Sequence, residues 1–149
     1  MSLQQDIMTA LKEAMKAKDQ TALTALRAVK SAILLAQTEA GAQEGLTEEQ
    51  ELKMLQKLVK QRKDSATIYL EQGREDLAAP ELAEAEVISQ FLPEALSEEE
   101  IEKIVLKVIA ETGAEGMKDM GKVMGVVSQE LAGKADGKTI STIVRQKLA

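Results

Sequence analysis

Apolar residues recur along this chain at spacings of three and four positions, which is the pattern of helices that bury one face. No segment sustains the alternation of β-branched and polar residues that is typical of strands. The pattern therefore predicts an all-α fold. Near the amino terminus the stripe expected to be buried consists of Leu3, Ile7, Leu11 and Met15.

Helix starts are marked by capping boxes, in which a hydroxyl side chain and a Gln or Glu three positions later satisfy each other's free backbone donors. Asp19 is a further capping residue and is expected to open the second helix. The three boxes are Ser2 with Gln5, Thr47 with Gln50, and Ser97 with Glu100.

Glycine and proline predict where the helices of the first part end. We expect the second helix to end at Gly41 and the third to end at Gly73. A fourth helix is expected to begin at about Pro80, because proline is tolerated in a first turn, and to reach Phe91 and Leu92. The expected buried positions are Ala22, Leu26, Val29, Ile33 and Ala36 in the second helix, and Leu52, Leu55, Val59, Ala66 and Tyr69 in the third.

The segment 92–96 interrupts the helical pattern, because Pro93 stops one helix and a new capping box follows at once. We therefore expect two modules, an N-terminal helical module at 1–93 and a C-terminal three-helix module at 97–149. The helices expected in the second module cover residues 97–111, 119–131 and 138–148.

Composition removes most familiar active sites. The 149 residues include no cysteine and no histidine, which excludes disulfides, thiol nucleophiles, imidazole bases and the common zinc sites. The net charge of −6 argues against general binding to nucleic acid or anionic membranes, and two aromatic residues are too few for base stacking. No apolar run reaches membrane-spanning length and no signal peptide is recognisable, so we expect a cytoplasmic protein with no membrane partner.

The segment 132–139 fits a relaxed nucleotide-binding loop, but the residues before it have helical and not strand spacing. We favour a structural turn at Gly133 and Gly137 that reverses the chain, with Asp136 capping the next helix. The same turn would place Lys134 and Lys138 beside a helix N-terminus, where they could hold a phosphate.

The last 35 residues are locally basic, with six basic and four acidic side chains and a net charge of +2. A solvated helical face is the common meaning of such lysines, and contact with a nucleic-acid backbone is the functional alternative. The candidate nucleic-acid-binding residues are Lys118, Lys122, Lys134, Lys138 and Arg145.

Other charged or sulfur-bearing groups have structural interpretations. The basic run 57–64 is interpreted as a helix surface supported by ion pairs, with recognition as the alternative. Carboxylate groups such as the pair Glu84 and Glu86, or residues 98–100, could suggest acid–base or metal chemistry, but residues 98–100 suit a first helical turn, where negative charge favours the helix dipole. Methionines 117, 120 and 124 are expected to fill the core. No catalytic residue, metal site or cofactor is expected.

Several strings make this chain similar to the YqeY family, and they cover nearly its whole length in the expected order and spacing. The strings are Leu26–Ile33, Lys60–Ser65, Gly73–Leu77, Phe91–Pro93 followed by Leu96–Ser97, Asp119–Gly125 and Gly133–Lys138.

The resemblance implies a second module similar to the C-terminal tail domain of the B subunit of glutamine-dependent tRNA amidotransferase. That enzyme converts misacylated Glu-tRNA or Asp-tRNA to the amide form, and its tail helps to bind tRNA. The resemblance also implies the family-level class of carbon-nitrogen ligases with glutamine as amido-N-donor. The catalytic sites of that enzyme lie outside its tail, so no independent activity is expected of this chain.

Two main hypotheses follow for function. The first is an accessory tRNA-recognition protein that binds tRNA through residues 97–149, alone or with an amidotransferase or aminoacyl-tRNA synthetase. The second is a helical adaptor that binds a partner protein without RNA. Enzyme function, as part of an amidotransferase assembly or by carboxylate chemistry, is a third alternative.

Overall fold

The computed structural model describes residues 2–39 and 45–149, and within these ranges it holds seven α-helices, one short 3-10 helix and no strand. The predicted all-α fold is therefore confirmed. The chain divides into two compact units, Met1–Leu92 and Pro93–Ala149. None of the helices in the described ranges is long and apolar enough to cross a membrane.

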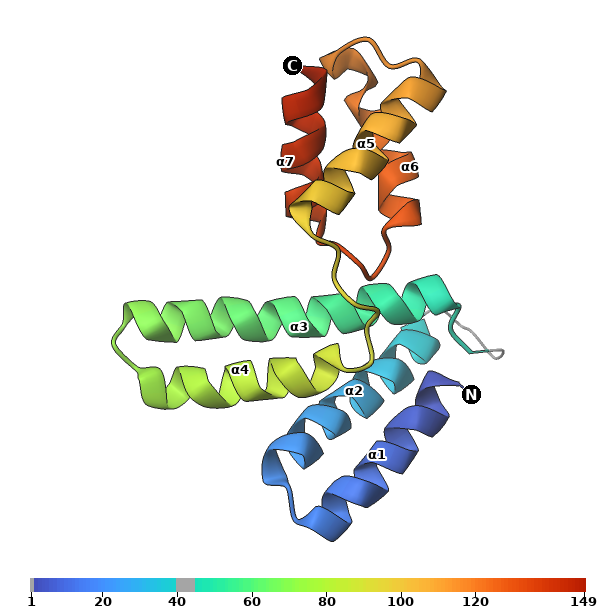
Figure 1. Cartoon of the computed structure of the whole chain (residues 1–149). Coiled ribbons are helices and arrows are strands. Elements are labelled where there is room, and N and C mark those ends of the chain that lie inside the picture. Colours follow the sequence, from blue (N-terminus) through green and yellow to red (C-terminus); the bar gives the residue numbers. More distant parts are fainter. Residues whose placement is uncertain (1, 40–44) are drawn as a thin grey trace. The chain divides into compact units, whose positions relative to one another are not determined.

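The first unit begins with a helical hairpin made of α1 (Leu3–Ala17) and α2 (Gln20–Glu39), which pack against each other (Figure 1). The capping box at Ser2 is present as predicted. The carboxylate of Asp19 accepts a hydrogen bond from the backbone N–H of Ala22 at 3.1 Å and caps α2, also as predicted. The predicted end at Gly41 lies outside the described residues.

The buried face of α1 differs from the prediction at one position. Ile7 and Leu11 are buried, but Met15 is 54% exposed and Ala14 is buried in its place. A strict spacing of four drifts around a helix that has 3.6 residues per turn, so the core-facing stripe moves back by one residue. Met15 was therefore wrongly assigned to the core.

A second hairpin pairs the long helix α3 (Glu48–Glu71) with α4 (Glu75–Ser89). The capping box at Thr47 opens α3 as predicted. Gly73 lies in the turn with φ of +70°, a conformation that glycine adopts without the steric penalty of a side chain. The turn is closed by a 2.7 Å hydrogen bond from the backbone N–H of Arg74 to the carbonyl of Tyr69.

The predicted start of the fourth helix was wrong. The helix α4 begins at Glu75, so Pro80 lies in its second turn and not in its first. Proline there lacks the N–H that would bond to the carbonyl of Asp76. Its side chain is exposed and clear of the core, which explains why the helix continues through it.

The core of the first unit joins α1 and α2 to one end of the second hairpin. Leu55 and Val59 of α3 and Ala85 and Ile88 of α4 belong to this cluster. Residues 63–83, which we call the distal hairpin and which are described throughout, contain only two buried side chains. These are Ala66 and Ala78.

The second unit packs three helices around one core (Figure 1). They are α5 (Glu98–Thr112), α6 (Met120–Glu130), which follows the 3-10 turn η1 (Met117–Asp119), and α7 (Gly137–Leu148). The predicted helices agree with these bounds to within one residue. Met120 and Met124 pack against the core as expected, whereas Met117 is exposed and was wrongly assigned to it.

Candidate nucleic-acid interface

The turn between α6 and α7 fixes the backbone around Lys134. Gly133 is buried and adopts φ of +79°. The backbone N–H of Lys134 donates to the carbonyl of Leu131 at 2.9 Å, and its carbonyl accepts from the N–H of Leu96 at 3.0 Å. The backbone of Lys134 is thus bonded on both sides while its side chain is exposed. Gly137, the other proposed turn residue, is the first residue of α7.

The five candidate cations are all exposed, and four of them form two pairs at opposite ends of α6. Lys118 lies in η1 and Lys122 in the first turn of α6, whereas Lys134 and Lys138 follow the opposite end of α6. A helix of 11 residues rises about 16 Å. The sequence therefore grouped residues that the fold separates into two pairs.

Arg145 extends the second pair along α7. It lies seven positions after Lys138, nearly two full turns, so the two side chains share one exposed face of the helix. The opposite face carries the buried residues Ile140, Ile143, Val144 and Leu148. A row of positive charge about 10 Å long therefore runs along the outside of α7.

Six of the eight basic residues of this unit, the five candidates and Lys103, have no ionic partner in the described ranges. Lys147 binds Glu102 at 2.7 Å and Lys107 approaches Glu111 at 3.8 Å. Across the described ranges, the structure records no ion pair for the five candidates. Their charges remain available to an external anion.

Carboxylates offset the positive charge at the Lys134 end. The bond between Leu96 and Lys134 brings this turn close to the first turn of α5, which carries Glu98, Glu99 and Glu100. Glu98 and Lys138 line the same surface hollow, of about 260 Å³. Residues 93–149 as a whole hold eight basic and ten acidic side chains, so attraction to a polyanion has to be local.

The N-terminus of α7 is already capped by an anionic side chain. The carboxylate of Asp136 accepts a 2.7 Å hydrogen bond from the N–H of Thr139. A phosphate at this end would be held by lysine side chains, because the cap uses one backbone donor and repels a second anion. The segment 132–139 follows α6 and not a strand, as its spacing predicted, so the context of a nucleotide-binding loop is missing.

The second basic cluster, at 57–64, forms ion pairs within and across helices. Lys60 binds Asp64 four positions later at 2.9 Å, which agrees with the structural interpretation. Arg62 instead faces Glu84 of α4, with 3.8 Å between Nε and Oε2, and both side chains are largely buried. Burial raises the pKa of Glu84 above its ordinary value, and the charge of Arg62 only partly opposes this rise in pKa.

Sequence reasoning missed the pairing of Arg62 with Glu84, although a signal was present. The two residues are each eleven positions from Gly73, the glycine that was expected to end α3. Residues equidistant from the turn of an antiparallel hairpin lie opposite each other. The described ranges hold no group of three or more acidic side chains arranged to bind a metal ion.

Comparison with known proteins settles the family. The family model described as Yqey-like protein matches residues 4–148. The chain belongs to the YqeY family. A protein of Saccharomyces cerevisiae named altered inheritance of mitochondria protein 41, mitochondrial, is 33% identical over 135 residues, which cover 89% of this chain and 69% of the relative.

Two further relatives match this YqeY-family chain in part. The Clavispora lusitaniae protein of the same name is 42% identical over 97 residues, 63% of this chain and 55% of the relative. A glutamyl-tRNA(Gln) amidotransferase subunit of Thermococcus gammatolerans is 41% identical over 73 residues, 46% of this chain. The match spans only 12% of the archaeal relative, and 55% of the Clavispora protein.

Proposed function

We propose that this chain is an accessory tRNA-binding protein whose second unit contacts the RNA backbone. The observation that carries the proposal is the set of five exposed cations between residues 118 and 145 that form no ion pair within the described ranges, unlike Lys107 and Lys147. Similarity to a glutamyl-tRNA(Gln) amidotransferase subunit supports tRNA as the RNA and an amidotransferase as a candidate assembly partner.

The contacts are electrostatic and independent of base identity. Neither aromatic residue of the chain, Tyr69 or Phe91, lies in the second unit, so stacking on bases is not available there. Lysine and arginine bind phosphates and release counterions, which gives affinity that falls with salt. We assign binding, and no catalytic step, to this chain.

The test is fluorescence anisotropy of the full chain with labelled tRNA over a salt series. Charge reversal of Lys122, Lys134 and Lys138 to Glu should weaken binding to many tRNAs alike. Each lost phosphate contact should reduce the slope of log affinity against log salt by about 0.7 to 0.9. Lys107→Glu is the control for a single charge reversal, since it changes the charge of the same unit as much as any one of the three substitutions but removes a lysine that already faces Glu111.

Separate double variants locate the contact. Lys118→Glu with Lys122→Glu alters one end of the unit, and Lys134→Glu with Lys138→Glu alters the other, so a contact at one end should respond to one variant alone. The proposal is wrong if the wild-type chain does not bind tRNA at low salt. It is also wrong if the triple variant binds as tightly as the wild type.

A further inference from the structure

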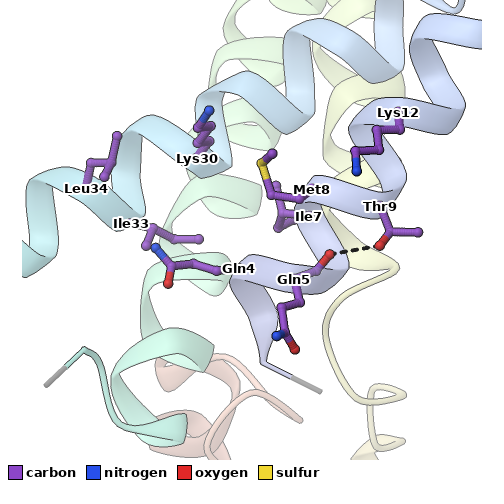
Figure 2. A pocket seen from close by; sticks show the side chains of 9 residues that line it. All are labelled: Gln4, Gln5, Ile7, Met8, Thr9, Lys12, Lys30, Ile33 and Leu34. Atoms are coloured by element: carbon purple, nitrogen blue, oxygen red, sulfur yellow. Dashed lines mark hydrogen bonds between the residues drawn. The ribbon is translucent and has the colours of Figure 1, made fainter.

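A groove whose exposed surface is mainly apolar opens between the two helices of the first hairpin. Its volume is about 400 Å³, and it is formed by the first half of α1 and the second half of α2. The buried residues Ile7 and Ile33 form its floor, while Met8 and Leu34 are 43% and 51% exposed. Figure 2 shows Met8 extending from α1 towards α2, with Gln4 reaching towards Ile33.

Two lysines border this groove on opposite helices. Lys12 comes from α1 and Lys30 from α2 (Figure 2). Both are exposed, and within the described ranges neither forms an ion pair. Among the described residues that line the groove, none is acidic. The site therefore combines an apolar floor with positive charge on both walls.

These features select the kind of occupant. A nucleic-acid backbone would match the lysines but would gain nothing from Met8, Ile33 and Leu34. An amphipathic helix matches both, because apolar residues at positions i, i+3 or i+4, and i+7 form a stripe flanked by charged positions. The span from Gln4 to Lys12 is about 12 Å along α1, which accommodates roughly two turns of a partner helix.

We propose that the groove between α1 and α2 binds an amphipathic helix of a partner protein, with acidic residues beside its apolar stripe. Met8 and Leu34 contact the stripe, and Lys12 and Lys30 attract the acidic flanks. This surface lies in the first unit, so the proposal does not depend on RNA binding by the second.

The probe is a displayed library of helical peptides of about 16 residues, roughly four turns, selected on the full chain. Selection against the variant Leu34→Glu removes peptides that bind elsewhere. We expect enriched sequences with an apolar stripe and acidic flanks. Enrichment that is equal on Leu34→Glu, or enrichment of basic peptides, would overturn the proposal. Leu35→Glu is the matched control, since Leu35 is 61% exposed and lies outside the groove.

Methionine methyl resonances then locate the selected peptide. The Met8 methyl should shift on titration, and those of Met120 and Met124 in the second unit should not. Charge reversal of Lys12 and Lys30 together should weaken binding roughly tenfold, because each exposed ion pair contributes up to about 1 kcal/mol. A Met8 shift caused by dilution of the chain alone would assign the groove to a second copy. A shift caused by dodecanoate and by no peptide would assign it to a fatty acid, and either result would refute the proposal.

The two proposals can fail separately. Leu34→Glu should leave the affinity for tRNA, measured by fluorescence anisotropy, unchanged. The variant with Lys122, Lys134 and Lys138 changed to Glu should still bind the selected peptide.

Discussion

The pairing of Arg62 with Glu84 is the most informative place to perturb the first unit. Their side chains are only 16% and 15% exposed, and the Arg62 Nε is buried without a hydrogen-bond partner in the described part of the chain. Removing one charge from a buried pair leaves the other unpaired, which costs about 3 to 5 kcal/mol when burial is complete. Because both groups keep some contact with water, we expect Glu84→Leu to lower the free energy of unfolding by about 2 to 3 kcal/mol.

Replacing both partners should recover most of the free energy of unfolding that Glu84→Leu loses. The double variant Arg62→Met with Glu84→Leu puts apolar side chains of similar size in place of the two charged ones. It therefore avoids the loss of hydration that burying two charges causes. We expect its stability to lie within about 1 kcal/mol of the wild type. Urea unfolding followed by the fluorescence of Tyr69, the single tyrosine of the chain, reports on this hairpin directly.

The pH dependence of stability gives a second test of the variants of Arg62 and Glu84. A carboxyl whose pKa is raised by folding binds more protons in the native state than in the unfolded state, from about its ordinary value of 4.5 up to its raised pKa. Stability therefore falls as pH rises through that window. The single variant Arg62→Met removes the charge that lowers the Glu84 pKa, so it should gain stability on acidification relative to the double variant. The account would be refuted if the double variant lost as much free energy of unfolding as the two single variants together. It would also be refuted if Glu84→Leu left the free energy of unfolding unchanged.

Two further changes test the fold. Pro80→Ala should raise the free energy of unfolding by about 1 to 3 kcal/mol, because it returns a donor to the carbonyl of Asp76 inside α4. Urea unfolding of the full chain measures this, and unchanged or lower stability would contradict the assigned helix start. Leu131→Ala should destabilise the second unit by about 2 to 5 kcal/mol. During urea unfolding, the far-ultraviolet circular dichroism of this variant should then change in two steps, and the transition reported by Tyr69 fluorescence should stay at the same urea concentration as in the wild type. A single transition shared by both signals would contradict this prediction, because it would mean that the two units unfold together.

The sequence predicted those features of the fold that depend on neighbours within one helical turn. Capping boxes are satisfied locally, so Ser2, Thr47 and Ser97 located three helix starts to the residue. Pro80 was misinterpreted because the rule for proline in a first turn says nothing about a helix that begins earlier without a side-chain cap. Met15 was misplaced because a spacing of four residues drifts around a helix of 3.6 residues per turn, so the fourth apolar position leaves the buried face.

The candidate sites were harder to predict, because they depend on how the helices lie in space. Net charge along the sequence placed Lys122 and Lys134 in one basic stretch, yet α6 separates them in space. The groove was not predicted because Met8 and Leu34 each directly follow a core residue, and the helical pattern was interpreted as a single buried stripe on each helix. Two adjacent apolar residues exceed what one buried stripe needs, so the pairs Ile7–Met8 and Ile33–Leu34 contained the signal.

The distal hairpin has a consequence for how the first unit can vary in length. Small residues, Ala66 and Ala78, are its only buried side chains, so nothing beyond the other hairpin helix depends on its extent. Removing about seven residues, or two turns, from α3 and the same number from α4 would preserve their facing register. The shared core around Leu55 and Ile88 would keep its contacts. The length of the hairpin can therefore change by two turns in each helix while the core of the unit stays the same.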